Sequence, residues 1–247
     1  MSPGFSVVSN IFAKLVRSPL TLWSSTDTNV DMKMPPEMVL FDCDGVLVDS
    51  ESLTAQTLCA DLRLHGLDIS IEQLSDLFLG GTIMGVAKRA RDMGAALPDD
   101  WIDRFYQKMF AVLAADVEAI AGIEFVLDQL DRAGILYAIG SNGPHRKMEI
   151  TLTKTGLMQR FDGRVYSRED VPTPKPAPDV YLKAAADAGI APERCVVIED
   201  SPNGALAGKA AGMLCFGFAA DTPAERLNPI CDHVFKEMRE LPGLLGL

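Results

Sequence analysis

The chain has 247 residues, of which 48% are hydrophobic, and a formal net charge of −11. This length suffices for one large hydrophobic core, or for a core domain with a smaller companion. The acidic balance argues against nucleic acids and anionic membranes as partners, because both require a basic surface. No apolar run approaches the roughly 20 residues that a membrane-spanning helix needs, so no membrane span is predicted.

The cysteines are odd in number, scattered, and without Cys-x-x-Cys spacing. This pattern favours reduced thiols in a reducing compartment over a disulfide framework or a zinc site. We therefore predict a cytoplasmic protein. The sequence leaves open whether it is a monomer or a dimer. The cysteines concerned are Cys43, Cys59, Cys195, Cys215 and Cys231.

Residues 1–35 are predicted to lie outside the fold. Residues 1–26 contain no Asp or Glu, are rich in Ser, and carry apolar residues at helical spacing, which is typical of an amphipathic targeting segment. A translation start at Met32, Met34 or Met38 explains the same segment at least as well. A helix that docks on a partner or on the protein's own core is the third possibility.

An apolar run at residues 38–41 ends in two aspartates spaced two apart. The run is bounded by prolines before it and by an acidic turn after it, which indicates a short, buried strand of a parallel sheet. Asp42 and Asp44 then lie at the carboxyl end of this strand, where open α/β sheets bind their ligands. Gly45 permits the sharp turn that brings Asp44 back toward Asp42.

The next part of the chain has a helical pattern, and the pattern then alternates between strand and helix. Glycines and Pro98 separate four predicted helices at residues 51–65, 71–79, 83–93 and 101–118. Alternation of this kind predicts a doubly wound, Rossmann-like α/β fold with a parallel sheet. The expected strands are 136–139, 164–166, 195–198 and 214–218, and the expected helices are 123–133, 145–155, 179–188 and 202–211.

Four motifs occur in a characteristic order. Residues 41–51 read FDCDGVLVDSE, Ser141 follows a second strand, Lys175 lies in a proline-rich loop, and Glu199 and Asp200 follow a further strand. Together these motifs resemble those of the haloacid dehalogenase superfamily of aspartate-nucleophile phosphohydrolases. The resemblance covers the chain from about residue 38 to residue 218.

This resemblance implies a domain organisation. The helical block after the first strand is similar to the superfamily's small helical cap. We therefore expect a catalytic core formed by residues 36–50 and 120–247 and a cap formed by residues 51–119. Substrate choice is expected to lie in the cap, because the core motifs recognise only the phosphoryl group.

The acidic residues of the motifs predict a metal site. Four carboxylates at one sheet edge would repel one another and a phosphate dianion, and a hard divalent cation such as Mg²⁺ removes this repulsion. By resemblance, the ligands are the carboxylates of Asp42 and Asp200 and the backbone carbonyl of Asp44. Glu199 is expected to ligate directly or through a water molecule.

The resemblance also implies the catalytic roles. Asp42 attacks phosphorus in line and forms an aspartyl-phosphate, while Asp44 protonates the leaving oxygen and later accepts a proton from water. The hydroxyl of Ser141 and the backbone N–H of Asn142 bind a non-bridging oxygen. Lys175 bridges the nucleophile and the phosphate and neutralises the remaining charge.

Three cap residues are candidates for substrate binding. Gly81 and Thr82 follow a glycine at a predicted helix start and allow close approach to a substrate. Arg89 carries a positive charge that would pair with a substrate carboxylate.

The predicted function is an Mg²⁺-dependent phosphomonoesterase that acts on a small phosphorylated metabolite. A sugar phosphate, a phosphogluconate-like compound or a phosphoglycolate-like compound is expected as substrate. One alternative is a phosphosugar mutase similar to β-phosphoglucomutase, although residues 79–85 lack the Arg that such mutases carry in the cap loop. A non-catalytic ligand-binding or regulatory protein is the alternative of another class.

Overall fold

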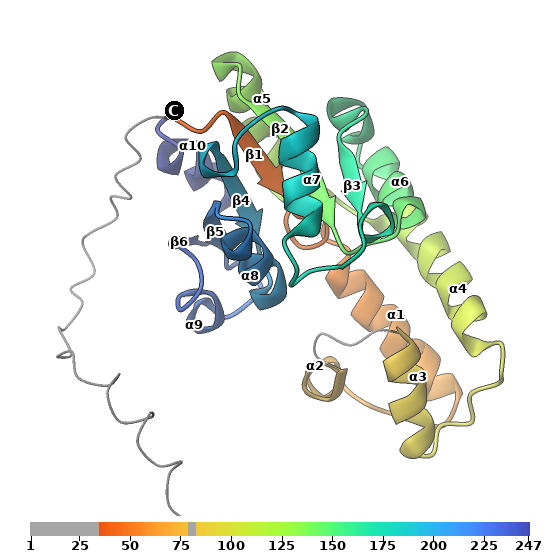
Figure 1. Ribbon diagram of the computed structural model, residues 1–247. Helices are drawn as coiled ribbons and strands as arrows, with labels where there is room; N and C mark the ends of the chain where they lie inside the picture. Colours follow the sequence, from red (N-terminus) through yellow and green to blue (C-terminus); the bar gives the residue numbers. More distant parts are fainter. Residues whose placement is uncertain (1–34, 79–82) are drawn as a thin grey trace, which may run out of the picture.

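The structure, a computed structural model, describes residues 35–78 and 83–247 (Figure 1). At its centre is a parallel sheet of six strands in the order β3-β2-β1-β4-β5-β6. The predicted doubly wound α/β fold is confirmed. The strands are β1 (Met38–Phe41), β2 (Leu136–Ser141), β3 (Val165–Ser167), β4 (Cys195–Glu199), β5 (Leu214–Phe218) and β6 (His233–Phe235).

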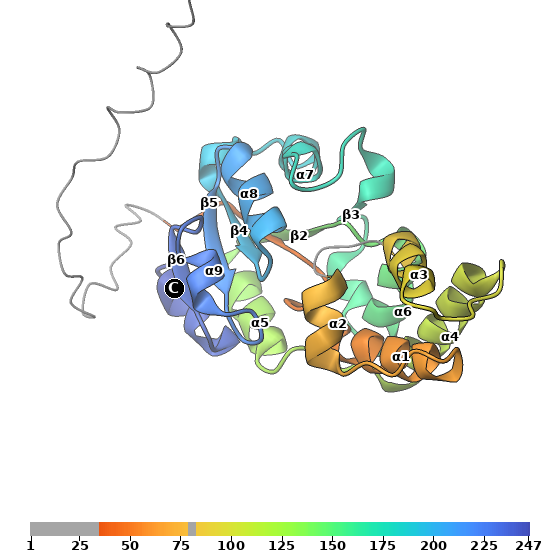
Figure 2. The ribbon, with the colours of Figure 1, turned by 90° about the horizontal axis from the view of Figure 1, so that it is seen from below.

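Helices cover both faces of the sheet (Figure 2). One face packs against α5 (Ile123–Ala133), α6 (His145–Lys154) and the C-terminal α10 (Leu241–Leu244). The other packs against α7 (Asp179–Asp187) and α8 (Pro202–Ala210). Because both faces are covered, the central strands are apolar at almost every position. The short remaining helices are α9 (Ala224–Leu227) and four 3-10 turns at Met158–Phe161, Arg168–Asp170, Pro192–Arg194 and Met238–Glu240.

The strand order places the topological switch point of the sheet between β1 and β4. From β1 the chain moves outward to β2 and β3, and it then returns to the other side of β1 to form β4, β5 and β6. In doubly wound sheets, ligands bind at such a reversal, outside the carboxyl ends of the strands. Both strands that flank this point end in a predicted site residue, Asp42 after β1 and Glu199 at the end of β4.

Four helices lie together beside the carboxyl ends of the strands (Figure 1). The described residues between 51 and 116 form helices and no strand. Trp101 and Phe105, stacked with ring centroids 5.2 Å apart, belong to a buried cluster that continues to the α5 and α6 side of the sheet. The division into a core and a cap at 51–119 stays a prediction. The helices are α1 (Glu51–Leu64), α2 (Ile71–Phe78), α3 (Ile83–Asp92) and α4 (Trp101–Asp116).

The sequence reading missed the edge strand β6. It has only three residues, His233 is polar, and only Phe235 is fully buried, so the strand has no period-2 pattern long enough to read. The predicted helix 101–118 ends two residues early because Val117 has extended backbone angles. The predictions for residues 1–34 lie outside the described residues.

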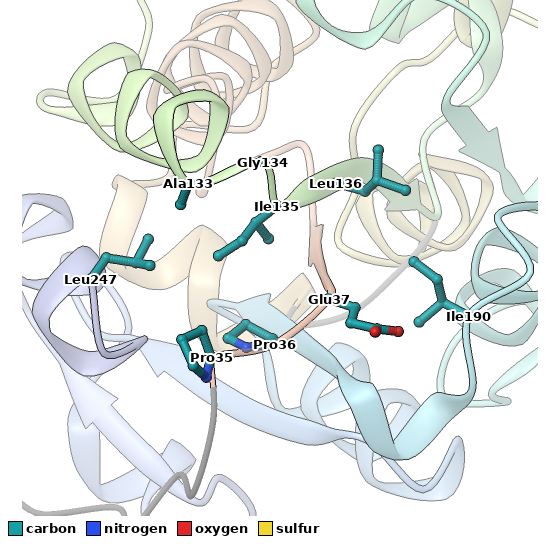
Figure 3. A pocket seen from close by; sticks show the side chains of 9 residues that line it. All are labelled: Pro35, Pro36, Glu37, Ala133, Gly134, Ile135, Leu136, Ile190 and Leu247. Carbon is teal, nitrogen blue, oxygen red and sulfur yellow. The ribbon is translucent and has the colours of Figure 1, made fainter.

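A hollow of about 400 Å³ opens near the amino ends of β1 and β2, at the end of the sheet away from the motif residues (Figure 3). Its walls are mostly apolar, and its one carboxylate, Glu37, pairs with Arg194. None of the predicted site residues lines it, so this hollow is not the candidate site. The lining residues are Pro35, Pro36, Glu37, Ala133, Gly134, Ile135, Leu136, Ile190 and Leu247.

Among the described residues, no helix is both long and apolar enough to cross a bilayer.

Candidate active site

The acidic residues of the first and fourth motifs meet at the switch point between β1 and β4. Phe41 pairs with Ile198 in the parallel register, so the next residues, Asp42 and Glu199, stand side by side. The N–H of Asp42 donates to the carbonyl of Ile198 at 3.0 Å, which continues the ladder by one residue. Because side chains alternate along a strand, Asp42 and Glu199 both point to the α7 and α8 face.

Lys175 joins the two carboxylates. Its Nζ lies 2.6 Å from Oδ1 of Asp42 and 2.7 Å from Oε1 of Glu199, and its side chain is only 3% exposed. The ring of Tyr181 lies beneath the ammonium group at 4.5 Å, and its hydroxyl donates to Glu199 Oε1 at 2.9 Å. The peptide between Lys175 and Pro176 is cis. A buried cation is thus held by two anions and an aromatic face.

Two glycines make room for this cluster. A Cβ at Gly140 would lie 2.8 Å from the Tyr181 ring, so a larger residue on β2 would displace the tyrosine. A Cβ at Gly204, in the first turn of α8, would lie 1.6 Å from Oε1 of Glu199. The second oxygen of Glu199 accepts from the backbone N–H and the hydroxyl of Ser201 at 3.1 and 3.0 Å. Glu199 therefore uses both oxygens within the protein.

The side chain of Asn142 anchors the Lys175 loop. Its Oδ1 accepts from the backbone N–H of Lys175 at 2.9 Å, and its Nδ2 donates to the Lys175 carbonyl at 3.1 Å. Ser141, buried at the end of β2, accepts from the N–H of Gly143 at 3.0 Å. Since that bond uses the oxygen of the Ser141 hydroxyl, its proton stays available for donation to an anion.

Asp44 lies in a different environment from Asp42. Its Oδ1 accepts from the Ser50 hydroxyl and pairs with Lys147 Nζ at 2.7 Å. Ser50 is fully buried and immediately precedes α1, whereas Lys147 comes from the first turn of α6. The two aspartates of the first motif thus have separate positively charged partners.

The electrostatics of the two aspartates differ accordingly. Burial, opposed by Lys175 and reinforced by Glu199 and Asp44, raises the pKa of Asp42 to about 7. Burial also acts to raise the pKa of Asp44, but the ion pair and hydrogen bond with Lys147 and the bond from Ser50 lower it overall. Burial, followed by repulsion from Glu199 and Asp42, raises the pKa of Asp200 well above its usual range.

The acidic cluster fits a hard divalent cation. Asp42, Glu199 and Asp200 each offer an oxygen, and these three atoms lie within 4.8 Å of one another. Lys175 supplies positive charge to Asp42 and Glu199, but no ion pair of Asp200 occurs among the described residues. A Cβ at Gly45, whose φ is +77°, would fall 2.2 Å from Asp200 Oδ2, so the carboxylate sits directly against the backbone of the first motif. Oxygen ligands with excess negative charge are the donor set that Mg²⁺ and similar ions prefer.

The structure does not place the three predicted substrate-binding residues of the cap at the acidic cluster. Gly81 and Thr82 lie outside the described residues. Arg89 occupies the last turn of α3. The substrate-binding roles of these three residues stay predictions.

The sequence predicted no role for several residues that support the cluster. Tyr181, Ser201, Gly204, Ser50 and Lys147 all contact a motif residue or its partner. Ser201 carries a readable signal, because a Ser followed by Pro is typical of a helix start, and its hydroxyl does accept from the N–H of Gly204 at 3.1 Å. Ser50 lies within the first motif at residues 41–51, whereas Tyr181, Gly204 and Lys147 are placed by tertiary packing, which no local pattern encodes.

The structure thus brings the four motifs together in a buried carboxylate–lysine cluster at the switch point of a doubly wound sheet. Residues 36–212 match the haloacid dehalogenase-like hydrolase family, and the chain belongs to that family. The prediction of an enzyme of the phosphate monoester hydrolase class is confirmed.

Similar proteins agree with this assignment. The chain is 28% identical over 210 residues to a 6-phosphogluconate phosphatase of Escherichia coli (strain K12), covering 84% of this chain and 94% of that protein. It is 31% identical over 179 residues to a phosphoglycolate phosphatase of Xanthomonas campestris pv. campestris (strain 8004), covering 72% and 80%. A HAD family hydrolase of Deinococcus radiodurans R1, solved with bound phosphate and sodium, is 34% identical with a TM-score of 0.74, covering 86% of this chain and 96% of that one.

Proposed function

We propose that the chain is an Mg²⁺-dependent phosphomonoesterase of small phosphorylated sugars or sugar acids, acting through an aspartyl-phosphate on Asp42. One observation carries the proposal: two aspartates two residues apart have different partners. Asp42 is paired with Lys175, and Asp44 is paired with Lys147 and Ser50. The separate partners hold the two carboxylates apart, which suits a nucleophile beside Lys175 and a displaced carboxyl group that exchanges the proton.

In the first half-reaction, a carboxylate oxygen of Asp42 forms a bond to phosphorus while the bond from phosphorus to the ester oxygen breaks. Asp44 delivers a proton to that leaving oxygen. In the second half-reaction, water attacks the phosphorus of the aspartyl-phosphate and gives a proton to Asp44. The bond from phosphorus to the Asp42 oxygen breaks, which releases inorganic phosphate and regenerates the Asp42 carboxylate. Lys175, held by Glu199 and Asp42, stabilises charge on the transferring group in both steps.

The cation site would involve Asp42 and Asp200, with the backbone carbonyl of Asp44. Glu199 uses both oxygens on Lys175, Tyr181 and Ser201, which favours a water-mediated contact for this residue. When bound, Mg²⁺ neutralises charge on the carboxylates and on the phosphate. The ammonium of Lys175 pairs with Asp42 and Glu199, so it offsets only part of the negative charge of the three clustered carboxylates.

The substrate class follows from the similar proteins and from the site. The related phosphatases act, by name, on 6-phosphogluconate and phosphoglycolate, both of which carry a carboxylate as well as a phosphate. We propose the same broad class for this chain. All five cysteines are free thiols, which supports a reducing compartment such as the cytoplasm.

The proposal is tested by release of inorganic phosphate from a panel that includes 6-phosphogluconate, 2-phosphoglycolate and several hexose phosphates, with and without Mg²⁺. Asp42→Asn serves as the blank. Release that requires both Mg²⁺ and Asp42 supports the proposal. A product that keeps its phosphate, with activation by a sugar bisphosphate, would assign a mutase instead. Binding of a phosphate analogue without hydrolysis of any ester would assign a binding protein.

A further inference from the structure

Lys147 is a half-buried cation that none of the four motifs includes. It is the third residue of α6, and its side chain is only 15% exposed. Its ammonium group lies 2.7 Å from Asp44 Oδ1 and 3.4 Å from the hydroxyl of Ser50. Three elements therefore meet at the Asp44 carboxylate: the turn after β1, the start of α1 and the first turn of α6.

The two oxygens of Asp44 have different surroundings. Among the described residues, Oδ1 takes both polar side-chain contacts, from Ser50 and from Lys147. Oδ2 lies on the side of Gly143, only 3.5 Å from where a Cβ of that residue would stand. Gly143 belongs to the loop whose Ser141 is expected to bind the phosphate. Asp44 is thus fixed by one oxygen and presents the other toward that loop.

We propose that Lys147 is a positioning residue for Asp44, which it holds by Oδ1 so that Oδ2 exchanges the proton with the leaving oxygen and with water. This inference rests on the proposed function, because it assumes that Asp44 is the acid and base. The proton moves from Oδ2 to the ester oxygen as the phosphorus–oxygen bond breaks, and it returns to Oδ2 from the attacking water. Lys147 itself exchanges no proton.

A direct contact with the substrate is the competing role for Lys147. Its ammonium would then pair with a substrate carboxylate or phosphate. The contact with Asp44 at 2.7 Å and the low exposure of the side chain favour the positioning role, because the ammonium group of Lys147 is already paired with a carboxylate of the protein. Lys175 provides the positive charge next to the nucleophile.

The two roles differ in their dependence on the leaving group. An alkoxide of a sugar leaves only with a proton, so its departure needs Asp44 in place. The 2,4-dinitrophenolate ion leaves without a proton. The constant kcat/KM reports the steps through the first bond cleavage, so it isolates the acid role of Asp44 from the later attack of water.

The experiment compares Lys147→Met, Lys147→Arg and wild type on 2,4-dinitrophenyl phosphate and on the sugar phosphate that is hydrolysed best. Lys154→Met, which removes an exposed lysine from the last turn of the same helix, is the matched control. We expect Lys147→Met to lower kcat/KM for the sugar phosphate by about 10- to 100-fold, as for a misplaced catalytic group. For the dinitrophenyl ester, kcat/KM of Lys147→Met should stay within about threefold of the wild-type value. Lys147→Arg should recover part of the loss in kcat/KM for the sugar phosphate.

An equal loss for both esters, or a loss confined to substrates that carry a carboxylate, would overturn the positioning role.

A crystal structure of Lys147→Met gives a readout that does not depend on activity. We expect the Asp44 carboxylate to have rotated away from its position beside Ser50 and Gly143. An unchanged Asp44 would contradict the inference even if wild type hydrolysed no ester, whereas that inactivity alone would count against the proposed function.

Discussion

The carboxylate of Glu199 lies directly against the backbone of Gly204. A Cβ at position 204 would stand 1.6 Å from Oε1, closer than any non-bonded contact allows. Gly204 belongs to the first turn of α8, and Glu199 ends β4, so this approach seats the helix on the acidic cluster. The absence of a side chain at 204 therefore allows Glu199 to reach Lys175.

Gly204→Ala should displace Glu199 and so disturb Lys175. Overpacking of this kind costs about 1–3 kcal/mol of folding free energy. A misplaced Lys175 should lower kcat by about 10-fold or more. Thermal unfolding and steady-state kinetics of the variant measure both effects.

Gly243→Ala is the matched control, because nothing lies within 4 Å of a Cβ at that helical position. It should leave kcat unchanged and alter stability by no more than about 1 kcal/mol. Full activity of Gly204→Ala would show that the position of Glu199 is irrelevant to turnover.

Lys175→Met should destabilise the fold as well as abolish turnover. It leaves Asp42 and Glu199 buried, adjacent and without their shared cation, and breaking a buried ion pair costs about 3–5 kcal/mol. Lys183→Met on α7 removes a lysine that is 38% exposed and pairs with Asp187, so its cost should be within about 1 kcal/mol. Denaturant unfolding of both variants checks the contrast, and equal costs would contradict it.

The sequence predicted the site residues that stand at the ends of strands. An apolar run that stops at Asp42, and another that stops at Glu199, place both carboxylates at one sheet edge once the strands are parallel neighbours. The alternation of strands and helices predicts that arrangement. The predicted turn at Gly45 corresponds to a φ of +77°, a conformation that favours glycine.

The supporting contacts could not be predicted in this way. Tyr181 reaches Glu199 only because Gly140, on a different strand, leaves space for its ring. Lys147 reaches Asp44 because α6 packs close to the turn after β1, which depends on the whole buried cluster on that face. Contacts between residues about 40 to 100 positions apart depend on packing and leave no local periodic signal.

Asp42→Asn should abolish phosphate release and leave the fold intact. The amide cannot act as a nucleophile, so a loss of at least about 10³-fold is expected. Lys175 keeps Glu199 as a partner at 2.7 Å, so the buried cation is not left alone. Phosphate release and circular dichroism, measured on the same preparation, test this. Retained turnover would place the nucleophile elsewhere.

Stabilisation by Mg²⁺ should depend on pH in a defined direction. The pKa of Asp42 is raised to about 7 and that of Asp200 lies well above its usual range, both chiefly through burial. Groups whose pKa is raised on folding contribute stability that is complete at low pH and lost as the pH rises through the folded value. The metal-free protein should therefore lose this contribution between about pH 4, near the unfolded value, and pH 7 or above.

At the proposed site Mg²⁺ would bind the ionised carboxylates, so binding would displace these protons, and affinity should rise by up to about tenfold per pH unit for each proton released. Saturating Mg²⁺ should accordingly raise Tm more at pH 8 than at pH 6. Calorimetry in two buffers of different ionisation enthalpy would detect the released protons directly. Asp200→Asn should reduce both the Tm increase and the proton release, because it removes a ligand that has no ion pair among the described residues. A metal effect on Tm that is the same at both pH values would place the cation away from Asp42 and Asp200.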